Sequence, residues 1–88
     1  MEFLNEFEVG KRYVFDKDIY IEFMITSNIG YDSNNECEEY WTNCCNNKFI
    51  EIEGRRLGII KIGESNYETI PEWCREVPSI RLLTENDL

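Results

Sequence analysis

The spacing of apolar residues predicts one helix in the middle of the chain. Within residues 33–47, SNNECEEYWTNCCNN, five such residues recur at intervals of three and four, as they do along one face of an α-helix. They are Cys37, Tyr40, Trp41, Cys44 and Cys45. Ser33 is expected to cap the helix together with Glu36, three residues later. We predict a helix near residues 34–46, with its apolar stripe and three cysteines packed against the core.

Shorter apolar runs predict about five strands around that helix. The runs are residues 9–15, 19–25, 48–53, 57–62, 67–70 and 77–83. The run 19–25 alternates with period two, which is typical of a strand, although Tyr20 and Met24 leave a short helix as an alternative. The run 57–62 is almost wholly apolar, as a central strand buried on both faces would be.

The stretch TIPEWC, residues 69–74, predicts how the sheet closes. Pro71 cannot donate to a strand ladder, so it is expected to end one strand and to begin a short 3₁₀ turn. Trp73 and Cys74 are then expected to point inward and close one end of the fold. Together with Trp41 they are the residues to which we assign a structural role.

The length and the apolar content suit one small domain. The chain has 88 residues, of which 42% are hydrophobic, enough for a single core. We predict one mainly β, α+β domain over residues 1–88, with short flexible ends at 1–6 and 84–88. Its expected form is an SH3-like, strongly bent antiparallel sheet or barrel of about five strands with one inserted helix. No apolar run could span a bilayer, and glutamates near the N-terminus do not suit a signal peptide, so a cytoplasmic location is expected.

Charge is the strongest compositional signal. Eighteen Asp and Glu oppose nine Lys and Arg, giving a net charge of −9. Residues 18–47 contain no Lys or Arg, and their acids are Asp18, Glu22, Asp32, Glu36, Glu38 and Glu39. Such a chain repels nucleic acids and anionic membranes, so neither is expected as a direct partner, whereas a basic protein would be attracted. Solubility alone is the other explanation, and a helix dipole would also favour acids in its first turns.

The composition argues against catalysis and against a metal or cofactor. The chain has no histidine, so the commonest general base and a frequent zinc ligand are missing. The four cysteines, Cys37, Cys44, Cys45 and Cys74, contain no C-x2-C pair, and we expect them to be reduced and buried as small apolar side chains. We therefore expect neither an enzyme nor a cofactor or metal site.

Three segments resemble a group of small SH3-like proteins encoded by bacteriophages of low-GC hosts. The segments are KRYVF at 11–15, EEYWTNCCNNKFIEI at 38–52 and YETIPEWC at 67–74. PEWC is the distinctive motif, and the resemblance covers roughly residues 9–77. The chain departs from the pattern at Asn46-Asn47, where an Asn/Asp-Gly turn is expected. The resemblance implies an SH3-like fold and a phage origin.

Two binding functions follow from these observations. In the first, the protein inhibits a host nucleic-acid-handling defence enzyme, as an anti-CRISPR does, by presenting the six carboxylates of residues 18–47 where the enzyme expects phosphates. In the second, it is an SH3-like adaptor or self-associating subunit, a homodimer among the options, that binds a peptide or protein through aromatics such as Tyr31 and Tyr67. A contiguous acidic face favours the first function, which is our prediction from the sequence, and an exposed aromatic patch favours the second.

Overall fold

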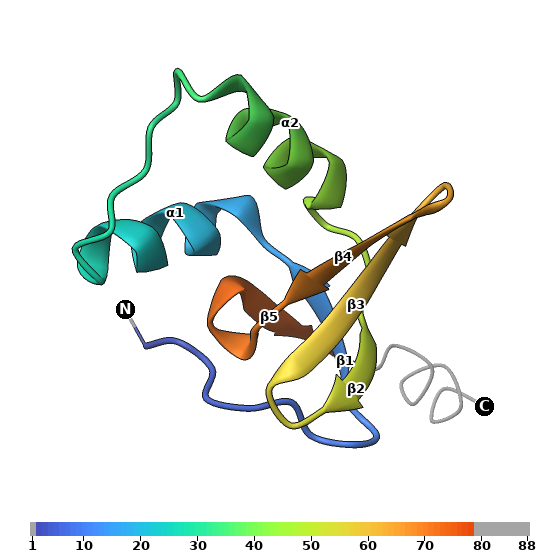
Figure 1. Cartoon of the computed structure of the whole chain (residues 1–88). Helices are drawn as coiled ribbons and strands as arrows, with labels where there is room; N and C mark the ends of the chain where they lie inside the picture. The colour runs from blue at the N-terminus through green and yellow to red at the C-terminus, as the bar shows by residue number, and fades with distance from the viewer. Residues whose placement is uncertain (1, 79–88) are drawn as a thin grey trace.

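The computed structural model describes residues 2–78 and contains, within them, five strands and two α-helices (Figure 1). Their order is β1 (Arg12–Phe15), α1 (Lys17–Thr26), α2 (Glu36–Cys45), β2 (Glu51–Gly54), β3 (Leu57–Ile62), β4 (Ser65–Thr69), a 3₁₀ turn (Pro71–Trp73) and β5 (Cys74–Val77). The predicted α+β class with about five short strands is confirmed. The expected flexible end at 84–88, and most of the run 77–83, lie outside the described residues.

The strands form two antiparallel sheets that do not close into a barrel. One sheet pairs β1 with β5, and the other has the order β2-β3-β4. An isolated bridge between Val14 and Phe49 joins them, flanked by a hydrogen bond from the Ile50 amide to the Tyr13 carbonyl at 3.1 Å. The expected single bent sheet or closed barrel is therefore wrong. The regular ladder breaks because Asn47 is left-handed, with φ at 63°, and the β2–β3 register shifts near Gly54.

Residues 17–26 form helix α1, so the strand expected over residues 19–25 is wrong and the helical alternative is right. The Asp16 side chain caps α1 by accepting hydrogen bonds from the amides of Asp18 and Ile19, at 2.9 and 3.2 Å. In the helical register, Tyr20 and Met24 are one turn apart, and both belong to the main core cluster. The apolar pattern alone allowed both a strand and a helix, and the Asp16 cap favours the helix.

Helix α2 is where the middle of the sequence predicted a helix, but its cap and its buried face differ. Asn35, and not Ser33, is the N-cap, and its side chain accepts a hydrogen bond from the Glu38 amide at 3.1 Å. The residues of α2 that are fully buried are Thr42 and Cys45. Of the predicted apolar stripe, Cys37 is exposed and Tyr40 is 66% exposed. The helix is thus rotated relative to the expectation.

The core lies between the two sheets and the helices, in two adjoining clusters. Phe15, Tyr20, Cys45 and Ile60 are the buried centre of the larger cluster. Phe7, Tyr13 and Cys74 are the buried centre of the smaller cluster. The expected 3₁₀ turn is present at Pro71–Trp73, and Trp73 packs against both clusters.

Figure 1 shows both helices on one side of the sheets, with the β3–β4 hairpin projecting past the end of α2. The N-terminal segment runs below α1, where the Phe3 ring meets the Phe23 ring edge-on at 5.3 Å, and the Phe7 amide donates to the Arg55 carbonyl at 2.6 Å. In the part of the chain that the structure describes, neither helix has the length and hydropathy needed to cross a bilayer.

Candidate protein-binding surface

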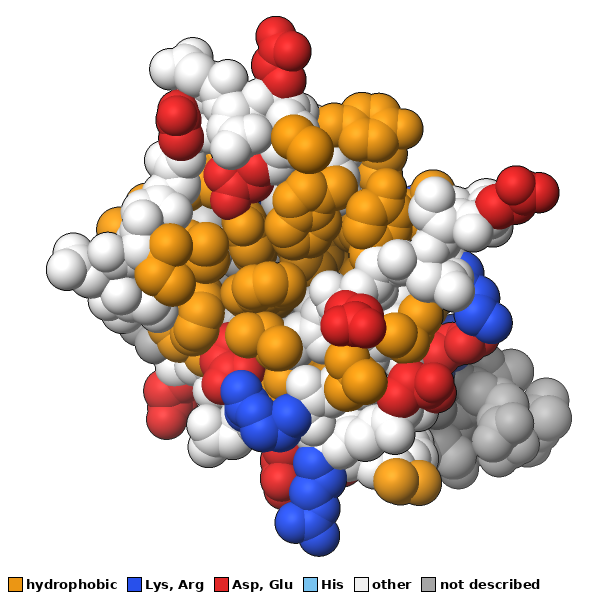
Figure 2. Space-filling model, in the orientation of Figure 1, with side chains coloured by type: hydrophobic (Ala, Val, Ile, Leu, Met, Phe, Trp, Pro, Cys, Tyr) orange, Lys and Arg blue, Asp and Glu red, His pale blue; other side chains and the backbone are white. Residues whose placement is uncertain are grey.

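Aromatic side chains line a hollow on the face of the molecule seen in Figure 2. The apolar side chains in this view gather between α2 above, α1 at the left and the β3–β4 hairpin at the right. Besides Phe23 of α1, which packs on Phe3, the aromatic residues of these elements, of the loop after α1 and of the 3₁₀ turn that keep part of their area accessible are Tyr31, Tyr40, Trp41, Tyr67 and Trp73. We call these five residues the aromatic surface.

The rings of the aromatic surface rest on a buried floor. The Tyr20 ring, which is 3% exposed, meets Trp41 and Trp73 edge-on at centroid distances of 5.2 and 4.9 Å. Trp41 in turn stacks on Tyr67, with centroids 6.4 Å apart and planes at 15°. Each such pair contributes about 0.5–1.5 kcal/mol beyond area burial. The accessible rings are therefore held in place from beneath, without a partner.

The rotation of α2 is what exposes Tyr40. If the predicted stripe faced the core, Tyr40 would be covered and Glu38 would point to solvent. Instead Tyr40 is exposed on α2, and the Cys44 side chain one turn further along raises the pKa of its phenol. A tyrosine that is 66% exposed beside further accessible rings is the kind of residue that anchors protein interfaces.

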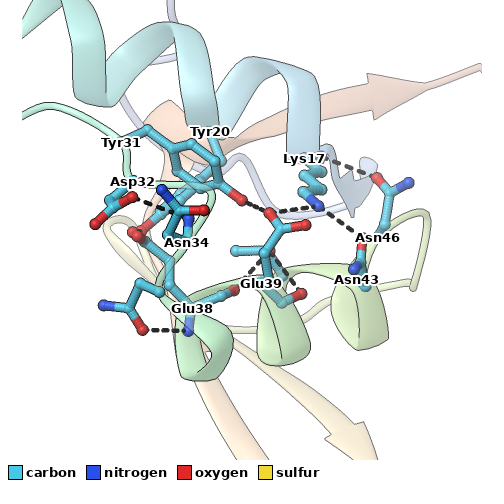
Figure 3. Close-up of polar contacts among 11 residues, drawn as sticks. Lys17, Tyr20, Tyr31, Asp32, Asn34, Glu38, Glu39, Asn43 and Asn46 are labelled. Atoms are coloured by element: carbon cyan, nitrogen blue, oxygen red, sulfur yellow. Dashed lines mark hydrogen bonds and ion pairs between the residues drawn. The ribbon is translucent and has the colours of Figure 1, made fainter.

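Polar contacts from α1 and the loop after it set the rotation of α2 (Figure 3). The Tyr20 hydroxyl donates to Glu38 Oε2 at 2.5 Å, and the Tyr31 hydroxyl donates to Glu39 Oε2. Lys17 Nζ lies 3.0 Å from the same Glu39 oxygen. Burial, and then the hydrogen bond with Glu38, raises the pKa of the Tyr20 phenol. The phenol therefore stays protonated and remains a donor over the physiological range.

Asparagine side chains extend this contact along the first turn of α1. Lys17 Nζ also donates to Asn43 Oδ1 at 2.7 Å, and the Lys17 amide donates to Asn46 Oδ1 at 2.9 Å. The Lys17 side chain retains only 16% of its area. It therefore neutralises part of the acidic end of α2 locally and offers little positive charge to a partner.

The structure does not assemble the six predicted acids into one face. Asp18 and Glu22 are exposed and one turn apart on α1, but each is two positions from Tyr20, or about 200° around the helix. They therefore lie on the side of α1 away from α2. Asp32 and Glu36 are exposed at the N-terminal end of α2.

Glu38 and Glu39 do not point outward as expected. Both are half-buried, because they accept the tyrosine hydrogen bonds that hold α2. Of the six acids predicted to bind a partner, four are therefore exposed, and they form two separate pairs: Asp18 with Glu22, and Asp32 with Glu36.

Two of the segments bordering the hollow nevertheless carry one sign of charge. Residues 18–47, which span most of α1, the loop and α2, contain six acids and no Lys or Arg. Residues 62–74, from the end of β3 into β5, contain Glu64, Glu68 and Glu72 and again no Lys or Arg. Of these three, Glu72 is paired with Arg56 at 2.9 Å, and Glu64 and Glu68 are exposed. The aromatic surface therefore lies among carboxylates.

The four cysteines differ in their exposure. All four are free thiols, with Cys45 and Cys74 buried and Cys37 exposed, so the expectation that every cysteine is buried is wrong. Burial raises the pKa of Cys45 to about 11 and that of Cys74 to about 12, which makes both poor nucleophiles near neutral pH. Among residues 2–78 no group of three or more metal-ligating side chains gathers.

Comparison of the chain with protein-family models, curated protein sequences and solved structures gives no match.

Proposed function

We propose that the protein binds a basic, apolar segment of another protein on its aromatic surface. One observation carries this proposal: five accessible aromatic side chains gather around one hollow, and the bordering segments 18–47 and 62–74 have carboxylates and no Lys or Arg. The cations next to these segments, Lys17 and Lys61, are paired with Glu39 and Glu51 at 3.0 and 3.2 Å. The aromatic groove was the alternative function considered for the sequence, and the exposed rings are what favour it over an acidic face.

The aromatic rings would supply most of the affinity. Tyrosine and tryptophan are enriched among the residues that dominate interfaces, because they bury a large area with little loss of side-chain freedom. Here the rings already have fixed neighbours: Trp41 stacks on Tyr67, and the Tyr31 hydroxyl is bound to Glu39. A preorganised surface loses less conformational entropy when it binds.

The surrounding charge would select the partner. Carboxylates at the rim of an interface raise the association rate of a cationic partner and repel an anionic one. The same rule disfavours a homodimer through this surface, because each copy has a net charge of −9. A segment with Lys or Arg beside aromatic or large aliphatic residues fits both properties.

Sorting a displayed library of random twelve-residue peptides against the purified chain tests this proposal. We expect the selected peptides to be cationic and to contain at least one large apolar residue. Tyr40→Ser should weaken their binding at least tenfold. Val9→Ser is the matched control, because Val9 is 95% exposed in the turn before β1 and its loss should leave binding unchanged. Selected peptides that are neutral or acidic, or that bind Tyr40→Ser as well as wild type, would contradict the proposal.

Inhibition of a host nucleic-acid-handling enzyme by an acidic face is the second candidate. It is supported by the exposure of Asp18, Glu22, Asp32 and Glu36 in a segment without exposed cations. The partner would be a basic nuclease or similar enzyme, with the carboxylates in place of phosphates. Reversing these four acids to lysine should then abolish binding to such an enzyme and remove its salt dependence, whereas Tyr40→Ser should have little effect.

The resemblance to SH3-like phage proteins remains part of the proposal. The 3₁₀ turn before the last strand and the hydrogen bonds between β1 and residues 48–50 support it, and the division into two sheets weighs against it. With that origin, the protein would act in the cytoplasm of the host cell as a binding protein without an enzymatic step.

A further inference from the structure

Strand β4 is an edge strand whose outer side has no partner among the described residues. It is last in the order β2-β3-β4. Within residues 2–78, residues 65–69 make backbone hydrogen bonds with no segment other than β3. Ser65, Asn66 and Glu68 are exposed. An unpaired edge of this kind can bind another strand through its main chain.

The turn before β4 determines which backbone groups are free. Gly63 and Glu64 form a two-residue hairpin loop, with Gly63 at a φ of 60° and Ile62 opposite Ser65. In such a loop the closing pair is hydrogen-bonded, and bonded and non-bonded pairs then alternate along the ladder. Tyr67 therefore bonds β3 through its backbone, whereas the N–H and C=O groups of Asn66 and Glu68 point away from it.

The free edge lies beside the aromatic surface. In Figure 1 the side of β4 opposite β3 faces the helices, across the hollow whose apolar lining Figure 2 shows. Tyr67, on β4 itself, stacks on Trp41 of α2. A strand added at this edge would place every second side chain on the face of the sheet that carries Tyr67.

We propose that the partner segment binds in extended conformation as a strand added to β4, through the backbone groups of Asn66 and Glu68, with alternate side chains on the aromatic surface. This inference rests on the proposed function and adds the conformation and register of the ligand. Two independent features meet at one place: unpaired main-chain groups, and aromatic rings on the same strand.

Charge identifies the occupant of the edge as a basic segment of another protein. Glu64 and Glu68 are exposed on the hairpin, and residues 62–74 contain no Lys or Arg. A second copy of β4 would bring the same two carboxylates against them, which costs stability. The chain's own residues 79–88 contain one arginine and two carboxylates, so they are no better matched.

The peptides selected in the library sort provide the probe, used with the full chain. Strand addition predicts that apolar residues recur at every second position of these peptides, with Lys or Arg between them. Helical docking would instead give spacings of three and four. The Asn66→Pro variant removes the outward N–H of β4 without touching the β3 ladder, and proline is tolerated at such edge positions. Asn66→Ala retains the N–H and is the matched control.

We expect Asn66→Pro to lower the affinity for the tightest-binding selected peptide at least about tenfold. Asn66→Ala should leave that affinity within about twofold of wild type. If Asn66→Pro does not fold, amide hydrogen exchange on the wild-type chain gives the same answer: the Asn66 and Glu68 amides should be protected only when the peptide is bound. Period-two peptides with this protection support strand addition.

Peptides with helical spacing, or amide exchange at Asn66 and Glu68 that the peptide does not change, overturn strand addition. The proposed function then stands if Tyr40→Ser still weakens binding at least tenfold. Peptides whose affinity is unchanged by Tyr40→Ser overturn the proposed function itself. Selection of acidic peptides overturns the choice of a basic occupant, and concentration-dependent dimerisation of the wild-type chain that Asn66→Pro abolishes would replace that occupant with a second copy.

Discussion

The molecule has two aromatic regions that use their rings in opposite ways. Around β1, Phe7, Tyr13 and Phe15 are each at most 2% exposed, because strands, the N-terminal segment and, for Phe15, rings of both helices cover them. In the aromatic surface, Tyr40 is 66% exposed and its four companions are half-buried. Both regions share Trp73, which contacts the clusters on either side.

The difference between the regions comes from what holds the surrounding elements. The β1 region is enclosed by backbone: two sheets meet there, and a methyl group at Gly58 would clash with the Ile50 side chain and lie 3.2 Å from Phe7 Cε2. The aromatic surface is supported on one side and held by hydroxyl–carboxylate contacts from α1 and the loop after it to α2. The orientation of an element, set here by polar contacts, decides whether a ring is buried.

Truncation of Phe15 should have the largest effect on stability. Phe15 is fully buried and contacts Tyr20, Trp41 and Trp73. We expect Phe15→Ala to lower the free energy of unfolding by about 3–5 kcal/mol, measured by urea denaturation. A loss below about 1 kcal/mol would mean that the enclosed region is loosely packed and that the contrast between the two regions is wrong.

Gly58→Ala should cost about 1–3 kcal/mol, because the added methyl group overpacks the contact with Ile50 and Phe7. The double-mutant cycle with Ile50→Ala sharpens this expectation. In the Ile50→Ala background the same change at Gly58 should cost clearly less, because the clashing Cγ2 is gone. Strictly additive effects in denaturant titrations would show that the backbone does not approach Ile50 so closely.

Alkaline pH should destabilise the enclosed region through Cys74. Burial raises the pKa of this thiol from 9.0 to about 12, so the native state holds the proton over a range in which the unfolded state has lost it. Its contribution is complete below pH 9 and falls by about 1.4 kcal/mol per pH unit as the pH rises towards 12. Cys45 and Tyr20, whose pKa values are also raised, add to the fall with the same sign.

Urea midpoints between pH 7 and 11 measure this dependence. Cys74→Ala should give a visibly shallower slope above pH 9 than wild type, whatever its stability at pH 7. Cys37→Ala is the matched control, because that thiol is exposed. Equal slopes in wild type and Cys74→Ala would show that the Cys74 site is open to water.

Tyr40→Ser should have the smallest effect on stability and a large effect on binding. A residue that is 66% exposed contributes little to the fold, so we expect a change within about 0.5 kcal/mol in thermal or urea denaturation. Loss of peptide binding without loss of stability would separate the two aromatic regions by function. A loss of 2 kcal/mol or more would instead make Tyr40 part of the core and remove the contrast.

The sequence predicted most elements but not their orientation. Helix α2, strands β2 to β4 and the 3₁₀ turn at Pro71 follow from local signals: apolar spacing, turn residues and the missing amide of proline. Helix α1 was ambiguous because its apolar residues satisfy both periods, and the Asp16 cap, which decides between them, is a single side chain.

The aromatic surface was the part that the sequence signalled least. The stripe through Tyr40 and Trp41 has the spacing of a buried face, and nothing local shows that Glu38 and Glu39 receive hydroxyl donors from Tyr20 and Tyr31, 18 and 8 residues earlier in the chain. The alternative stripe of Glu38, Thr42 and Cys45 also has helical spacing, but its carboxylate made it the poorer choice for a core-facing side. Long-range polar contacts of this kind do not follow from periodicity.

Helix α2 is attached to the rest of the molecule by those polar contacts and by the packing of Trp41 and Cys45 in the larger core cluster, without any strand pairing of its own. A helix with an exposed outer face and no sheet hydrogen bonds opens more readily than the paired strands, as an independent cooperative unit. We therefore expect the amides of α2 to exchange with solvent through local opening, well before those of β3 and β1. A ligand bound between α2 and β4 would slow that exchange, because it would stabilise the closed helix. Amide exchange in α2 would then report how much of the aromatic surface is occupied.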